Sequence, residues 1–170
     1  MTYSENDYVD VTRKNLLQEI ASLMDDEFNG KPGKGMWSIA QVCHHLVLVE
    51  KSTVKVIGWG IKEPPSTNIE RRKVNLILDR EKKIQAPKIV EPDEQPFAVQ
   101  QIIDLLNDSR TKLMTVLRTI NDKSILEKKS VNHPAFGELP LDQWVDLIPL
   151  HEQRHIEQIK EIKSILGITN

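Results

Sequence analysis

Two histidines one helical turn apart are the first residues whose spacing suggests a chemistry. His151 and His155 occur in the string HEQRH, and apolar residues recur around them at intervals of three and four. The resulting stripe reads Trp144, Ile148, His151, His155, Ile159, Ile162 and Leu166. Residues at i and i+4 project from the same face of a helix, so both imidazoles are expected to point into the core. Because a buried histidine costs free energy unless its ring nitrogens find partners, a shared metal ion would stabilise this pair.

A third histidine lies on a second apolar stripe, which reads Val42, His45, Val49 and Val56. His44 falls about 100° away around the same helix, beside Gln41, Lys51 and Lys55. Two ligands from one helix and one from another leave coordination positions open, as in catalytic zinc sites. We therefore predict that His45, His151 and His155 bind a divalent metal. Nitrogen ligands suit zinc, nickel and copper, and we expect zinc or nickel. The alternative is that all three are interior histidines bonded to backbone or carboxylates.

The chemistry expected of such a site is activation of a nucleophile. A divalent ion lowers the pKa of a water in an open position, or it binds and activates a thiolate. The string HEQRH also matches the H-E-x-x-H signature of zinc peptidases, in which the glutamate is a general base. After His155 the chain reads IEQIKEIKSILGITN, without the further histidine and the glycine of the longer metzincin signature, so a peptidase is disfavoured.

Two further residues are candidates for catalysis. Glu152 is a candidate base toward a metal-bound water, and the alternative is a solvated carboxylate on the helix surface. His133 is a candidate proton donor from the loop that precedes the last helix, and the alternative is an ordinary loop residue. Cys43 lies two residues before His45 and turns away from the ligand face, so we expect it to pack in the core.

Helical periodicity also predicts the elements that position these residues. Gaps rich in proline or glycine at 29–36, 62–68, 86–96 and 132–140 separate four long amphipathic segments. The first helix is expected to carry one apolar face made of Leu16, Leu17, Ile20, Leu23, Met24 and Phe28. The third carries the stripe Ile102, Ile103, Leu106, Leu113, Leu117 and Ile120. The charged segment 69–85 is expected to form a short solvated helix.

The ends of the other two helices have sequence signals. Ser38 can cap the second helix, with Gln41 completing a capping box, and this helix is expected to run to about Trp59. The fourth helix is expected over 141–166, with Gly167 as its C-terminal cap and a kink or break at Pro149. Four such helices without strand signals predict an all-α protein, an antiparallel four-helix bundle with a longer central crossover, formed by one domain over 1–170.

Composition excludes several functional classes. The 170 residues carry a net charge of −2, with 23 Lys and Arg against 25 Asp and Glu, so nothing predicts nucleic-acid binding. No apolar run approaches the roughly 18 residues of a membrane-spanning helix, so no membrane role is expected. A single cysteine, Cys43, and a polar start of the chain favour a reducing cytoplasm.

Two long runs resemble a known family. MWSIAQVCHHLVLVE, residues 36–50, and HPAFGELPLDQWVDLIPLHEQRHIEQIKEI, residues 133–162, resemble the DinB superfamily, including its YfiT-like metal-dependent hydrolases. The resemblance implies that His45, His151 and His155 are the metal ligands, as the two stripes also indicate. It further implies a four-helix bundle, commonly dimeric, that binds nickel or zinc. Some branches are thiol transferases that use bacillithiol, mycothiol or glutathione. The middle of the chain, 60–96, matches no pattern of the family.

These observations favour a metal-dependent enzyme that acts on a small molecule. The candidate reactions are S-transfer of a low-molecular-weight thiol and hydrolysis of a small substrate. We expect the protein to be a homodimer without a nucleic-acid partner. The alternative is a non-catalytic helical bundle in which a metal stabilises a dimerisation module.

Overall fold

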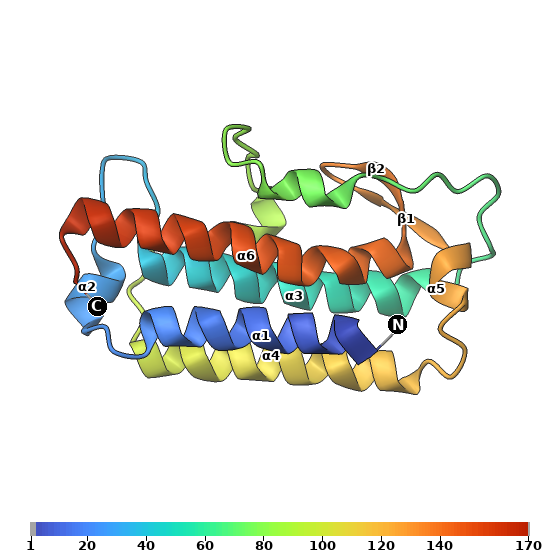
Figure 1. Ribbon diagram of the computed structural model, residues 1–170, viewed down its shortest axis with the longest axis horizontal. Coiled ribbons are helices and arrows are strands. Elements are labelled where there is room, and N and C mark those ends of the chain that lie inside the picture. The colour runs from blue at the N-terminus through green and yellow to red at the C-terminus, as the bar shows by residue number, and fades with distance from the viewer. Residues whose placement is uncertain (1–2, 170) are drawn as a thin grey trace.

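Four long helices lie side by side in the computed structural model, which describes residues 3–169 (Figure 1). They are α1 (Tyr3–Ile20), α3 (Ile39–Gly60), α4 (Val99–Thr119) and α6 (Leu141–Leu166). Two short helices, α2 (Asp25–Asn29) and α5 (Ile125–Lys128), cover the ends of the bundle. The expected four-helix bundle is confirmed. Among residues 3–169, no helix combines the length and the apolar composition that crossing a membrane requires.

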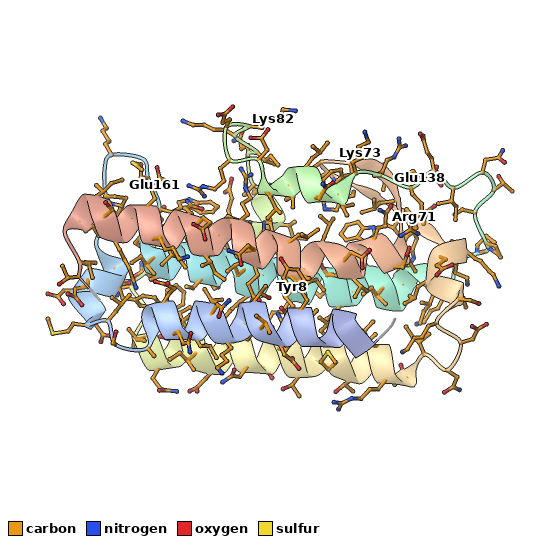
Figure 2. The ribbon with its side chains drawn as sticks, viewed as in Figure 1. Tyr8, Arg71, Lys73, Lys82, Glu138 and Glu161 are labelled. Atoms are coloured by element: carbon orange, nitrogen blue, oxygen red, sulfur yellow. The ribbon has the colours of Figure 1, made fainter. Side chains whose placement is uncertain are left out.

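A long crossover, residues 61–98, sets the directions of the helices. It contains two short 3-10 helices, η1 (Val74–Leu78) and η2 (Lys88–Val90), which contact α6 and α3 respectively. The crossover returns the chain to the end of the bundle where α3 begins, so α3 and α4 run in the same direction, as do α1 and α6 (Figure 1). Lys73 and Lys82 project from the outer side of the crossover, away from the bundle (Figure 2).

The signals for the helix ends are confirmed. Ser38 Oγ accepts a hydrogen bond from the Gln41 backbone N–H at 3.1 Å, and Gln41 Oε1 accepts one from the Ser38 N–H, also at 3.1 Å. Gly167 ends α6 with a φ of 67°, in the left-handed region that glycine adopts without a steric penalty. Of the kink or break expected at Pro149, the break is absent, since α6 is one helix through this residue. Pro149 is buried together with the apolar residues before it, and this packing holds the helix on both sides of the missing hydrogen bond.

The prediction of one continuous first helix with an apolar face up to Phe28 is wrong beyond Ile20. The chain turns there, and α2 begins again after Met24, whose side chain is 63% exposed instead of lying on a common apolar face. Three acidic residues fill the first turn of α2, where the helix dipole favours negative charge. The turn allows the fully buried Phe28 to enter the core from a different direction. Periodicity alone continues across the turn and does not reveal it.

Two other segments differ from expectation. The segment 69–85 contains the 3-10 helix η1 between irregular stretches instead of a solvated α-helix, and Ile77 is buried against α6. The gap at 132–140 contains most of a hairpin, in which β1 (Ser130–His133) pairs antiparallel with β2 (Gly137–Pro140). These strands have four residues each, which is too short for a clear alternating pattern.

The core is divided into two apolar clusters. One packs around Phe28, Ile39 and Ile159, and the other around Ile57, Leu113 and Leu139. On α6 the first cluster ends at Ile156 and the second at Ile148, and the residues between them include the candidate ligands. A layer of buried polar side chains therefore crosses the middle of the bundle between two apolar halves.

Candidate metal centre

Three imidazoles meet in this middle layer, and we call them the imidazole cluster: His45 from α3, and His151 and His155 from α6. His151 Nε2 lies 3.0 Å from His155 Nε2 and 3.4 Å from His45 Nε2. The three candidate ligand atoms all lie within 4.8 Å of one another. His45 and His155 are buried and His151 is half-buried. The structure thus brings together the three side chains that the two apolar stripes selected.

The other ring nitrogens of two of these histidines have acceptors. His45 Nδ1 is 2.7 Å from the Val90 carbonyl oxygen of η2, and His155 Nδ1 is 2.7 Å from Gln158 Oε1 one turn further along α6. A carbonyl oxygen can only accept, so in each case Nδ1 carries the proton. The Nε2 lone pair is then free to bind a metal, and these partners fix the orientation of each ring. Trp37 packs beside one member of the cluster, with its ring centroid 5.1 Å from that of His45.

Burial keeps these imidazoles neutral. Burial, together with the neighbouring His45, lowers the pKa of His155 to about 3. The pKa of His151 is lowered well below its usual range by burial and by the other two imidazoles, and burial also lowers the pKa of His45. Neutral imidazole is the form that binds a metal. With Nδ1 protonated on two of the rings, the cluster presents more lone pairs than protons, a donor set that a divalent cation satisfies.

Glu152 does not lie within the imidazole cluster. Its carboxylate is 2% exposed, with Oε2 accepting from Thr12 Oγ1 and Oε1 accepting from Arg13 Nε, both at 2.7 Å. Adjacent residues of a helix point about 100° apart, so Glu152 faces α1 and α4 while His151 faces α3. The solvated position considered for this carboxylate is therefore wrong, and its role as a base stays a prediction.

Glu152 belongs to a group of four charged residues, which we call the charge layer: Arg13, Glu50, Arg110 and Glu152. Each comes from a different long helix, and all four are buried. Arg13 contacts Glu50 at 3.0 Å and Glu152 at 2.7 Å. Arg110 Nη2 contacts Glu50 at 3.0 Å and Glu152 at 3.4 Å. Two guanidiniums thus link two carboxylates, and the layer is neutral as a whole.

Sequence reasoning missed the charge layer, although the signal that identified the histidines was present. Arg13 lies on a stripe with Val9, Leu16 and Ile20, and Arg110 follows Ile102 and Leu106 at the same kind of spacing. A charged residue on an apolar stripe requires a buried partner, just as a histidine does.

His133 lies at the end of β1, beside the last helix. Its ring centroid is 4.6 Å from that of Trp144, and its Nδ1 accepts from the Ala135 backbone N–H at 3.0 Å. Burial lowers its pKa to about 4, so the ring is neutral at physiological pH. Because Nδ1 accepts, Nε2 carries the proton. His133 is outside the imidazole cluster but near enough to lower the pKa of His151.

Two other residues near the cluster face away from it. Cys43 is fully buried, as expected for a packing residue, and burial raises the pKa of its thiol. His44 Nδ1 accepts from the Asp93 backbone N–H at 3.0 Å, and its ring contacts Phe97. The crossover therefore contacts two adjacent histidines of α3: Val90 contacts His45, and Asp93 contacts His44.

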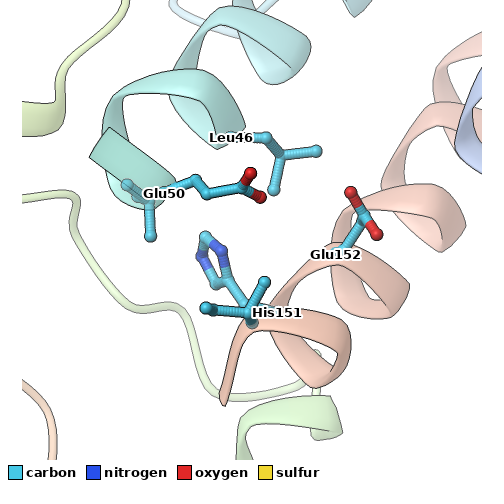
Figure 3. Close-up of a pocket in the computed structure, with 6 residues that line it drawn as sticks. Leu46, Glu50, His151 and Glu152 are labelled. Carbon is cyan, nitrogen blue, oxygen red and sulfur yellow. The ribbon is translucent and has the colours of Figure 1, made fainter. Parts of the chain in front are cut away.

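A small cavity separates the imidazole cluster from the charge layer (Figure 3). Its volume is about 10 Å³, and its walls are Leu46, Val49, Glu50, Ile148, His151 and Glu152. The carboxylate of Glu50 and the ring of His151 approach each other from α3 and α6, whereas the carboxylate of Glu152 points away from that ring (Figure 3).

The fold and this centre define a four-helix bundle with a three-histidine group that could hold a metal ion. The sequence profile of the DinB superfamily matches residues 8–159, and the chain belongs to this superfamily. The uncharacterized protein YuaE of Bacillus subtilis is 32% identical over 146 residues, which are 86% of this chain and 89% of YuaE.

Two solved structures share the fold. YfiT from Bacillus subtilis, described as a probable metal-dependent hydrolase with an unusual four-helix bundle topology, matches with a TM-score of 0.66 and 17% identity over 99% of this chain and 91% of that chain. The four-helix bundle protein TT2238 matches with a TM-score of 0.63 and 20% identity over 93% of this chain and 97% of that chain.

Proposed function

We propose that the protein is an enzyme that binds zinc or nickel through His45, His151 and His155 and acts on a small molecule. The observation that carries this proposal is the convergence of three Nε2 atoms, two of them on rings whose Nδ1 protons are held by carbonyl oxygens. Three nitrogen ligands leave positions open for a substrate or water. The description of YfiT as a probable metal-dependent hydrolase supports the same class of function.

The proposed substrate is a low-molecular-weight thiol, for S-transfer, or a small molecule that water hydrolyses. A divalent ion supplies the same help to both reactions, because it lowers the pKa of the thiol or water that binds to it. The chain's own contribution is to hold the three imidazoles neutral and oriented. Both oxygens of Glu152 already accept hydrogen bonds from Thr12 and Arg13, so the contacts favour His133 as the second catalytic group. Its neutral ring would donate a hydrogen bond from Nε2–H to the developing charge on a leaving group, without transferring the proton.

Because both oxygens of Glu152 already accept hydrogen bonds, this carboxylate is a poor candidate for a catalytic base. This observation favours a second candidate function, a non-catalytic bundle in which the metal stabilises a dimerisation module. The variant His45→Ala discriminates between the two functions. An enzyme is expected to lose turnover and keep its fold, whereas a structural site is expected to lose thermal stability and dimerisation as well. We propose a homodimer in either case, and a cytoplasmic location. Sedimentation equilibrium measures whether the protein is a dimer in solution.

Metal content tests the proposal directly. The protein is purified without an affinity tag and analysed by elemental mass spectrometry, beside a His151→Ala/His155→Ala double variant. We expect close to one zinc or nickel per chain in the wild type and none in the double variant. Absence of metal in the wild type after reconstitution with either ion, with the fold intact by circular dichroism, would overturn the proposal. Thiol-transfer and ester-hydrolysis panels on the loaded protein then separate the two reactions.

A further inference from the structure

The third ligand of the imidazole cluster differs from the other two in its outer contacts. His45 and His155 each have a carbonyl oxygen at Nδ1. Among residues 8–169, whose side chains the structure describes, none forms a hydrogen bond with Nδ1 of His151, and this ring borders the small cavity. A ligand imidazole without an outer acceptor has no fixed tautomer, and outer acceptors are a general requirement of histidine metal ligands.

The small cavity beside His151 could hold a water molecule that accepts a hydrogen bond from Nδ1 of this ring. Its volume of about 10 Å³ is close to the space that one water molecule needs. Three of its walls are apolar side chains and the other three are polar: Glu50, His151 and Glu152. A buried water requires two to four polar partners, and this cavity offers them.

Of the two carboxylates, only Glu50 has an oxygen whose hydrogen bonds are all 3.2 Å or longer, and this oxygen is the better acceptor for such a water. Both oxygens of Glu152 are engaged at 2.7 Å, by Thr12 and Arg13. Glu50 Oε1 instead receives two longer hydrogen bonds of 3.2 Å, from Ser109 Oγ and from Arg110 Nε. Glu50 also approaches the ring of His151 from the opposite helix, whereas the Glu152 carboxylate points away from it (Figure 3).

We infer that Glu50 is a positioning residue of the metal centre, acting on His151 through one water in this cavity. His151 Nδ1–H donates to the water, and the water donates to Glu50 Oε1. All three rings then carry their proton on Nδ1 and present Nε2 to the metal. Arg13 and Arg110 hold the Glu50 carboxylate in place, so the charge layer serves the metal centre as well as the core. This inference rests on the proposed metal binding.

The test compares two variants that remove the same charge from the same layer. Glu50→Gln and Glu152→Gln each leave two arginines facing one carboxylate, so both are expected to lose stability. Zinc affinity is measured by competition with a chromophoric chelator, on protein shown to be folded by circular dichroism. Glu50→Gln is expected to weaken zinc binding 10- to 100-fold, the usual effect of removing an outer partner. Glu152→Gln is expected to change it less than threefold.

A further variant keeps both carboxylates, in case Glu50→Gln does not fold. Val49→Leu adds one methylene group at the cavity wall and is expected to displace the water, with a tenfold or greater loss of zinc affinity. In the wild type, ¹⁵N-histidine NMR of the zinc-loaded protein is expected to show the His151 proton on Nδ1. Equal losses of affinity in Glu50→Gln and Glu152→Gln, or unchanged affinity in Val49→Leu, would overturn the inference. A wild type that binds no zinc or nickel would instead refute the proposed function.

Discussion

Replacing Arg110 by methionine tests whether the two arginines of the charge layer are both needed to neutralise its two buried carboxylates, as the contacts indicate. The Arg110 guanidinium donates to Glu50 Oε1 at 3.2 Å and to Glu50 Oε2 at 3.0 Å, and it also donates to the Val9 carbonyl at 2.8 Å. Without it, Arg13 alone faces two carboxylates that are only 4% and 2% exposed, so solvent screens neither. Removing one partner of a buried ion pair costs about 3–5 kcal/mol, and we expect a loss of this size in the free energy of unfolding at pH 7.

The assay is urea unfolding followed by circular dichroism, with a chelator present to exclude metal effects. In the wild type the layer is neutral, because two guanidiniums face two carboxylates. The double variant Arg110→Met/Glu50→Gln is also neutral and is expected to recover at least about 2 kcal/mol relative to the additive loss. A loss below about 1 kcal/mol in Arg110→Met, or no recovery in the double variant, would refute this account of the layer.

Three further predictions concern other parts of the molecule. Gly60→Ala is expected to destabilise the protein by about 1–3 kcal/mol, because the new Cβ would lie 2.9 Å from Leu141 and 3.0 Å from Val131, and urea unfolding measures the loss. The pKa of His133 is about 4 in the fold and 6.5 ordinarily, so the unfolded chain binds more protons between these values and stability falls as pH drops through this window. Between pH 7 and pH 5 the metal-free wild type should lose about 1 kcal/mol more than His133→Gln, after allowance for partial exposure. Chelation of a bound metal should lower the melting temperature of the wild type but not of the His151→Ala/His155→Ala variant, since a ligand at 100 times its Kd contributes about 2.7 kcal/mol.

Clear outcomes would contradict each of these three. An unchanged stability of Gly60→Ala would mean that the side chains of Leu141 and Val131 move away from the new Cβ without cost. Parallel pH profiles for the wild type and His133→Gln would show that His133 titrates normally in the fold. An equal effect of the chelator on both proteins would place the stabilising metal elsewhere.

The sequence predicted the parts of the protein that side-chain periodicity controls. The stripes on α3 and α6 predicted the facing directions of His45, His151 and His155, because each imidazole replaces an apolar residue at a core position. Ser38 and Gly167 predicted their helix ends because a capping hydroxyl and a left-handed turn each require particular residue types.

The remaining features depend on atoms that the sequence does not distinguish. The acceptor of His45 is the backbone carbonyl of Val90, and any residue at that position would offer the same oxygen. Arg154 likewise holds the crossover through the carbonyl oxygens of Ile77, Asp79 and Lys82. The charge layer could be suspected from Arg13 on its apolar stripe, but its pairing required the relative positions of four helices.

The contact between Val90 and His45 couples the stability of the crossover to the affinity of the site for a metal. If the crossover must be in place for His45 to present its lone pair, then opening the crossover weakens the hold on the metal, and metal binding raises the free energy of that opening by the same amount. The coupling is reciprocal, so the crossover reports on the occupancy of the site. Amide hydrogen exchange in residues 71–93 would then slow on metal addition, and proteolytic cleavage there would release the ion.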